Sequence, residues 1–230
     1  MTEALYLEHI RVETSAFISA MKGNMTKPVP SCPGWTVTDL SDHMWGVYSF
    51  WGDIAEGRLQ DPKEAVEPDH PAPKDLASAI DAASERLVNV FNEAEPFEPI
   101  WTWSSNKTIS FLPRRMAHEI EVHRWDCESA SGKPSGVDPT MAADGITEFI
   151  EHFFGSDQAW EGAGAHALLR TPEGEWSLAA GTAPVDPDAV IDGSSSDVFL
   201  ALWRRVPLES LTIEGDLEDP QRLFAWSDLG

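Results

Sequence analysis

Residues 114–134, RRMAHEIEVHRWDCESASGKP, set the expected fold of the first part of this chain. At about 100° per residue, four positions of a helix over 113–131 share one narrow stripe, namely Met116, Ile120, His123 and Cys127. Glu119 lies at the edge of this stripe, one turn before His123. A carboxylate and an imidazole four residues apart therefore point toward the apolar face of the helix. Because burial of an unpartnered carboxylate is costly, Glu119 must have a partner.

A second helix, expected over residues 36–51, also directs a histidine toward its apolar side. Its stripe consists of Leu40, Met44, Val47 and Trp51, with His43 among them. Helices that aim such residues inward are typical of metal sites in helical bundles. Together, His43, Glu119 and His123 offer two nitrogens and one oxygen, a set that suits zinc and leaves a fourth position for water or substrate. The set suits nickel, iron or manganese less distinctively.

The same residues are compatible with a core that holds no metal. A histidine on an apolar face is commonly a hydrogen-bonded core residue, and Glu119 and His123 could simply pair with each other. Arg114 and Arg115, about one turn before Glu119, are further partners for that carboxylate. Asp126, three residues after His123, could orient the imidazole from behind or could be a surface or capping carboxylate.

His118 and the two cysteines are expected to stand outside this cluster. The zinc-protease pattern H-E-x-x-H is not met, since three residues separate Glu119 from His123. His118 lies about 140° around the helix from His123 and is expected to point elsewhere. Cys32 and Cys127 are too few for a disulfide framework and lack an obvious basic partner. We therefore expect two reduced thiols and no nucleophilic cysteine.

Periodicity and turn residues divide the chain into a helical part and a mixed part. Helices are expected over 3–22, 36–51, 74–94, 113–131 and 139–154, consistent with an antiparallel four-helix bundle and a shorter partner helix. Strands are expected over 166–171, 175–180, 189–192 and 211–214, and helices over 194–205 and 220–226. We predict an α+β protein with two domains, a metal-binding helical bundle over 1–154 and a small α+β domain over 155–230.

Composition and charge limit the range of partners. The chain has 230 residues, with 16 Lys and Arg against 39 Asp and Glu, a net charge of −23. Such a surface repels nucleic acid and anionic lipid. No stretch is apolar over the ~20 residues of a membrane span, and the first residues lack the layout of a secretory signal. We expect a cytoplasmic protein that binds small molecules and needs local positive charge for any anionic substrate.

Three segments of the chain match recurring patterns. Residues 29–47, VPSCPGWTVTDLSDHMWGV, contain P-x-C/T-P-G-W and then a helix with the inward His43. Residues 114–134 contain E-x-x-x-H-R-x-D, which begins at Glu119 and includes His123. With residues 190–216, VIDGSSSDVFLALWRRVPLESLTIEGD, they resemble the mycothiol-dependent maleylpyruvate isomerase-like family of the wider DinB-like bundle superfamily. The resemblance covers nearly the whole chain.

The resemblance implies a metal-dependent thiol enzyme of actinobacterial type. In that family the metal deprotonates the thiol of mycothiol; in the isomerase the thiolate adds to the cis double bond of maleylpyruvate, and rotation and elimination give fumarylpyruvate. It implies His43, Glu119 and His123 as ligands of zinc or another divalent metal, and mycothiol as the thiol cofactor. Other members resemble thiol S-transferases, so either reaction is expected. The alternative is a non-catalytic metal- or small-ligand-binding protein of the same fold.

The resemblance also implies a catalytic arginine in the C-terminal domain. In the family such an arginine clamps the substrate carboxylate. Arg205 best matches the family's L-W-x-R position, and Arg204 stands beside it. Both are also compatible with an ordinary surface role.

Overall fold

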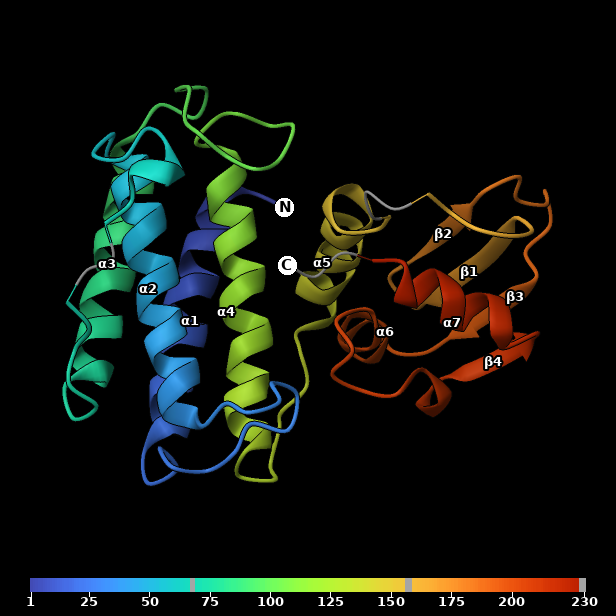
Figure 1. Ribbon diagram of the computed structural model, residues 1–230, viewed down its shortest axis with the longest axis horizontal. Helices are drawn as coiled ribbons and strands as arrows, with labels where there is room; N and C mark the ends of the chain where they lie inside the picture. The colour runs from blue at the N-terminus through green and yellow to red at the C-terminus, as the bar shows by residue number, and fades with distance from the viewer. Residues whose placement is uncertain (67–68, 156–158, 228–230) are drawn as a thin grey trace. The chain divides into compact units, whose positions relative to one another are not determined.

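The computed structural model describes residues 1–66, 69–155 and 159–227, which divide into two compact units (Figure 1). The first unit comprises Met1–Ser135 and the second Gly136–Gly230. Among the described residues, no helix combines the length and hydropathy needed to cross a bilayer. Each unit has its own core of buried apolar side chains.

The described part of the first unit contains four long helices: α1 (Glu3–Met21), α2 (Val37–Ala55), α3 (Leu76–Glu93) and α4 (Phe111–Ser129). The predicted start of α2 is confirmed by a capping box, in which the Asp39 amide donates to the Thr36 hydroxyl and the Thr36 amide donates to the Asp39 carboxylate. A short 3₁₀ turn, η1 (Pro62–Glu64), interrupts the connection between α2 and α3. These bounds agree to within a few residues with the ranges that hydrophobic periodicity predicted for all four helices.

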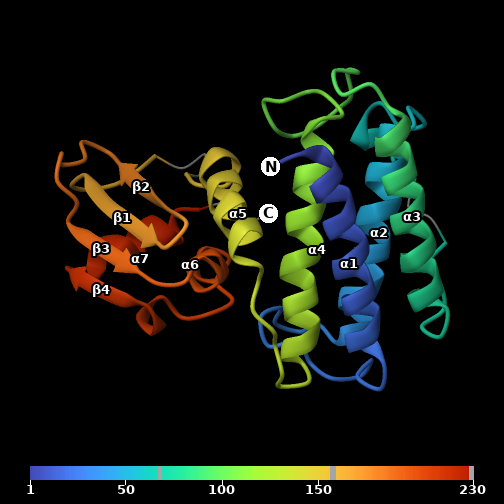
Figure 2. The same ribbon diagram turned by 180° about the vertical axis from the view of Figure 1, so that it is seen from behind.

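The directions of these helices differ from the predicted antiparallel arrangement. Along α1 and α4, contacts advance together, since His9 meets Glu121 and Phe17 meets Cys127. Figures 1 and 2 show α2 and α3 likewise running in one direction, opposite to α1 and α4. The connection over residues 56–75 explains this, because it can span ~60 Å when extended, well beyond the ~27 Å length of α3. A long connection lets the chain return to the starting end, as in other bundles with crossovers.

The core of the first unit is apolar with a few satisfied polar groups. Fully buried side chains include Phe17, Leu40, Met44, Ile80, Leu87 and Ile120. The buried Tyr48 hydroxyl on α2 lies 2.8 Å from Thr14 Oγ1 on α1, which lies 3.3 Å from Ser84 Oγ on α3. Three helices are thus joined by one hydroxyl chain inside the core.

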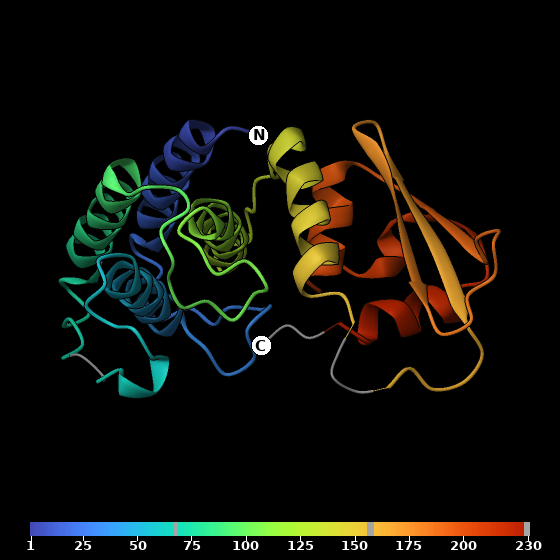
Figure 3. The ribbon, with the colours of Figure 1, turned by 90° about the horizontal axis from the view of Figure 1, so that it is seen from above.

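Where the structure describes it, the second unit is a mixed four-stranded sheet with three helices, which confirms the predicted α+β class. Its strands are β1 (Ala165–Thr171), β2 (Gly174–Ala180), β3 (Ala189–Asp192) and β4 (Thr212–Gly215), in the order β2-β1-β3-β4. The β1–β3 pair is parallel and the other two pairs are antiparallel. The helices are α5 (Pro139–His152), α6 (Ser195–Leu202) and α7 (Glu218–Ala225), and Figure 3 shows them on one face of the sheet. Another 3₁₀ turn, η2 (Leu208–Ser210), precedes β4.

The place of α5 corrects the predicted domain boundary at 154/155. The division falls between residues 135 and 136, so that α5 belongs to the second unit. There the Phe149 ring packs against Trp203 with centroids 5.2 Å apart, and the Trp176 indole donates to Thr147 Oγ1 at 2.9 Å. A 3.6-residue period shows that a helix has a buried face but not which partner covers it. The fifth helical segment was therefore predicted correctly and assigned to the wrong domain.

Candidate metal centre

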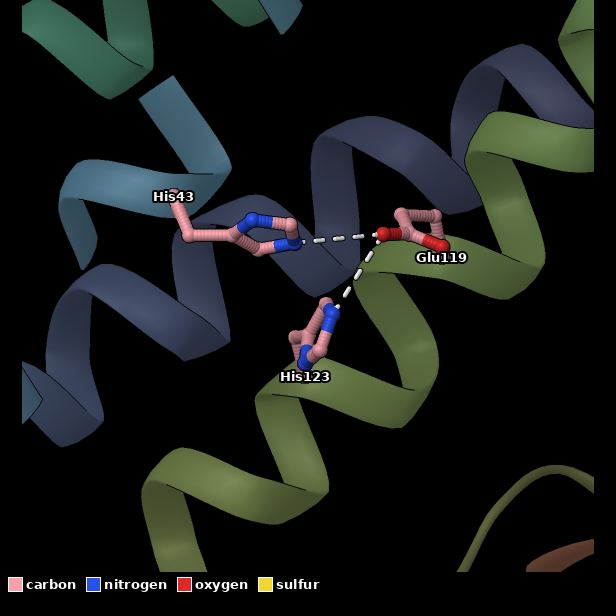
Figure 4. A group of neighbouring side chains, drawn as sticks. All are labelled: His43, Glu119 and His123. Carbon is pink, nitrogen blue, oxygen red and sulfur yellow. Dashed lines mark ion pairs between the residues drawn. The ribbon is translucent and has the colours of Figure 1, made fainter. Parts of the chain in front are cut away.

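Three donor atoms from two helices of the first unit converge at one point (Figure 4). His43 is on α2, and Glu119 and His123 are one turn apart on α4. His43 Nε2 lies 3.5 Å from Glu119 Oε1, and His123 Nε2 lies 3.3 Å from the same oxygen. All three donor atoms lie within 4.8 Å of one another. The structure thus brings together the three residues that the sequence singled out, although α2 and α4 are distant in the chain.

Neighbours on α4 hold the outer atoms of two of these side chains, His123 and Glu119. His123 Nδ1 lies 2.9 Å from Asp126 Oδ2, which leaves Nε2 directed at the cluster. Arg115 Nη2 donates to Glu119 Oε2 at 3.0 Å, which leaves Oε1 for the cluster. Each side chain therefore presents one defined donor atom, as metal sites with oriented ligands do.

The pKa values reflect these contacts. Burial raises the pKa of Glu119, but hydrogen bonds from His123 and His43 and the charges of His123 and Arg115 outweigh it, and hold the pKa well below its usual range. Burial lowers the pKa of His123, but hydrogen bonds to Asp126 and Glu119 and the charges of both carboxylates raise it to about 9. The metal-free cluster thus favours an ionised Glu119, the form that binds metal, and a protonated His123, which must release its proton when a metal binds.

The spacing of the donors fits a small divalent ion. Tetrahedral ligands ~2.05 Å from zinc lie ~3.3 Å from one another. Glu119 Oε1 lies 3.3 and 3.5 Å from the two nitrogens, close to that edge length, and the two nitrogens lie within 4.8 Å of each other. The side chain of His43 is 34% exposed and that of Glu119 is 22% exposed, so a further ligand can reach the cluster from solvent. Two nitrogens, one oxygen and an accessible fourth position fit a catalytic rather than a closed structural zinc site.

His118 and Cys127 are held by contacts other than those of the cluster, whereas Cys32 contacts Asp126. His118 is buried beside Glu121 with Nδ1 and Oε2 3.6 Å apart, so it points away from the cluster as predicted. The thiol of Cys127 is buried against Phe17 O, and burial, with nearby acidic charge, raises its pKa to about 12. Because of this raised pKa, Cys127 is a neutral thiol at physiological pH. Cys32 Sγ lies 3.9 Å from Asp126 Oδ2.

Arg204 and Arg205 lie in the second unit, just after α6. Arg204 has a left-handed backbone, with φ of 60°, and its Nη2 donates to three carbonyl oxygens, those of Phe224, Ala225 and Ser227. Arg205 Nη1 donates to Trp203 O at 2.8 Å, and both arginines line a surface pocket of about 390 Å³ with Pro207 and Gln221. Arg204 is thus engaged with the carbonyl oxygens of residues 224–227, and Arg205 with that of Trp203.

Two contacts near the cluster were not anticipated from sequence. Ser31 Oγ donates to Asp126 Oδ1 at 2.5 Å, and the Trp35 ring packs against His43 with centroids 5.2 Å apart. Both residues belong to the P-S-C-P-G-W segment, which periodicity reads only as a loop. The family resemblance of this segment, which precedes the helix with His43, was the one sequence signal that pointed to a role for it near the cluster.

A helical unit with a His–Glu–His cluster, followed by an α+β unit, defines a two-unit protein with a candidate metal centre in its first unit. Residues 7–128 match the mycothiol maleylpyruvate isomerase N-terminal domain, and residues 140–222 match the C-terminal domain of the same family. The chain belongs to the mycothiol maleylpyruvate isomerase family.

Solved structures agree on the fold. The crystal structure of a histidine-to-alanine mutant of the mycothiol-dependent maleylpyruvate isomerase is similar with a TM-score of 0.70 and 15% identity, over 95% of this chain and 96% of that chain. The crystal structure of the unmutated enzyme gives a TM-score of 0.68 and 16% identity over the same shares. No curated protein sequence matches the chain closely. At this identity, the structural likeness bears on the fold and not on the substrate.

Proposed function

We propose that this protein is a metal-dependent thiol enzyme that uses mycothiol, either as a cis–trans isomerase of the maleylpyruvate type or as a thiol S-transferase. In this proposal the first unit is a DinB-like metal-binding bundle. The observation that carries it is the convergence of His43 Nε2, Glu119 Oε1 and His123 Nε2 at one solvent-accessible point. Membership of the family supports mycothiol as the thiol cofactor.

Each side chain has a defined task in this proposal. His43, Glu119 and His123 hold the metal, and Arg115 keeps Glu119 ionised and oriented through its 3.0 Å hydrogen bond. A bound divalent ion lowers the pKa of a thiol and so provides a thiolate at neutral pH. Arg205 is proposed to bind the carboxylate of the second substrate. The reaction needs no protein nucleophile, in keeping with the neutral thiol that the buried Cys127 holds.

A second candidate is a metal- or small-ligand-binding protein without catalysis. The observation that favours it is the set of partners of Glu119, which two imidazoles and Arg115 already stabilise. Such a cluster can persist for stability alone, with or without metal. The two candidates differ in whether an external thiol reaches the metal.

Metal content and thiol binding test the proposal. We expect purified protein loaded with zinc to hold one equivalent, and His43→Ala, Glu119→Ala and His123→Ala to hold none. His70→Ala is the matched control, because this exposed histidine pairs with Asp42 outside the cluster. Zinc retained by all three ligand variants contradicts the site.

Cobalt-substituted protein then separates the two candidates. We expect mycothiol to change the visible spectrum of the cobalt protein, since a thiolate ligand adds charge-transfer bands. A spectrum that mycothiol leaves unchanged, with no protection against unfolding, favours the non-catalytic candidate.

A further inference from the structure

Asp126 contacts both His123 of the His43–Glu119–His123 cluster and a loop from another part of the chain. Its side chain is fully buried. One carboxylate oxygen, Oδ2, lies 2.9 Å from His123 Nδ1, and the other, Oδ1, accepts a hydrogen bond from Ser31 Oγ at 2.5 Å. Both oxygens therefore have fixed partners, which sets the plane of the carboxylate and with it the direction of the imidazole.

Ser31 is itself held by a closed loop, residues 28–36. The loop is tied at its base by the bridge between Pro28 and Thr36, and the Val29 amide donates to Trp35 O at 2.9 Å. Gly34 has φ of 88°, a left-handed conformation that suits glycine and lets the chain turn back within the loop. The backbone that carries Ser31 is thus held in place by hydrogen bonds and turns within the loop.

The same loop touches the other histidine of the cluster. The Trp35 ring lies against His43, with centroids 5.2 Å apart. Ser31, in the middle of the 28–36 loop, therefore supports His123 through Asp126, and Trp35, near the end of the loop, contacts His43 directly. The two histidines come from different helices, so a shared loop fixes their separation.

We propose that Asp126 and Ser31 are positioning residues of the metal centre: Ser31 orients Asp126, and Asp126 holds His123 with its proton on Nδ1 and its Nε2 lone pair directed at the metal. The inference rests on the proposed function, because it assigns residues that support the same site. A carboxylate accepts hydrogen bonds and does not donate them, so it selects this tautomer of a neutral imidazole. Partners of this kind are worth tenfold to a hundredfold in metal affinity.

Zinc affinity of single and double variants tests the proposal, with competition against a chromophoric chelator as the measurement. We expect Asp126→Ala and Asp126→Asn to weaken zinc binding by about tenfold to a hundredfold, and Ser31→Ala to weaken it by about fivefold, as for loss of one hydrogen bond. In the Asp126→Ala background, Ser31→Ala should add no further loss, because Ser31 acts through Asp126. The cobalt spectra of the Asp126 variants should shift as well.

Two matched controls separate positioning from folding. Glu121→Gln alters another buried carboxylate of α4, one that bonds His9 at 3.1 Å. Ser41→Ala removes a buried hydroxyl of α2 that donates to Val37 O. Both should keep wild-type zinc affinity even where they lower the melting temperature. Ser31→Ala, at a half-buried loop position, keeps the test decisive if the Asp126 variants do not fold.

The outcomes distinguish this inference from the proposed function. If wild-type protein binds zinc and Ser31→Ala and the folded Asp126 variants bind it equally well, the positioning role is wrong and the metal site stands. An additional loss from Ser31→Ala in the Asp126→Ala background also overturns the relay through Asp126. If wild-type protein takes no metal at all, the proposed function fails and the inference fails with it.

Discussion

The substitution His43→Ala should separate metal binding from folding. His43 is the proposed metal ligand on α2. Its side chain is 34% exposed, and it contacts Glu119 and the rings of Trp35 and His123. Loss of this partly exposed side chain removes one of the partners of Glu119 and should cost about 1 kcal/mol. Without metal, the variant should therefore unfold only a few degrees below the wild type, since 1 kcal/mol corresponds to about 2–4 °C.

Zinc should then stabilise the wild type far more than the variant. At free zinc 100-fold above the dissociation constant, the wild type gains about 2.7 kcal/mol. If the variant binds 100-fold more weakly, it gains only about 0.4 kcal/mol under the same conditions. For a chain of this size 1 kcal/mol corresponds to about 2–4 °C, so zinc should raise the wild-type melting temperature by roughly 5–10 °C and that of the variant by less than about 2 °C.

Thermal unfolding followed by circular dichroism, with and without zinc, measures this difference. Glu119→Ala is expected to lower stability without metal by more than His43→Ala does, because it removes the carboxylate that the buried Arg115 contacts. His70→Ala should respond to zinc as the wild type does. Equal zinc shifts in the wild type and His43→Ala, or no shift in the wild type, would refute the reasoning.

Three further substitutions test the site and the fold. Arg205→Ala should leave zinc stoichiometry unchanged but lower turnover of a carboxylate substrate, measured by steady-state kinetics; wild-type turnover removes Arg205 from the proposal. Tyr48→Phe should cost about 1 kcal/mol in urea unfolding, since the buried hydroxyl bonds Thr14; no loss contradicts that assignment. Arg86→Met should cost about 1 kcal/mol at pH 7, because Arg86 bonds Glu56 and lowers its pKa. Stability from a lowered carboxylate pKa is present above the unfolded value and lost as the pH falls through the folded one, so the gap to wild type should narrow below pH ~4; a constant gap excludes the ion pair as its cause.

Local sequence signals predicted the helices and strands well, and spatial partners less well. Periodicity located α1 to α5, and turn residues located the β1–β2 hairpin, because both depend on neighbours in the chain. The parallel pairs α1/α4 and α2/α3 and the docking of α5 on the second unit depend on which apolar faces meet. Apolar helix faces are chemically alike, so the apolar stripe of a helix does not show which other element packs against it.

The candidate site shows the same division. The inward direction of Glu119 and His123 followed from their four-residue spacing on one helix. That His43 meets them required the packing of α2 against α4, which the resemblance supplied and helical geometry did not. The Ser31–Asp126 hydrogen bond joins residues 95 positions apart in the chain. A loop serine leaves no periodic signal, so only the folded structure reveals this contact.

The net charge of the His43–Glu119–His123 cluster and its neighbours determines whether the cluster attracts an anionic thiolate. Without metal, the raised pKa of His123 keeps its imidazole protonated at neutral pH, so the charges of His123, Arg115, Glu119 and Asp126 amount to about 0. A divalent ion bound as proposed displaces that proton and changes the sum to about +1. The chain as a whole carries −23. Because such a surface repels anions, the metal-loaded cluster is a local exception that attracts a thiolate. Thiolate binding at this cluster should therefore require metal, whereas binding of a carboxylate by Arg205 in the second unit should not.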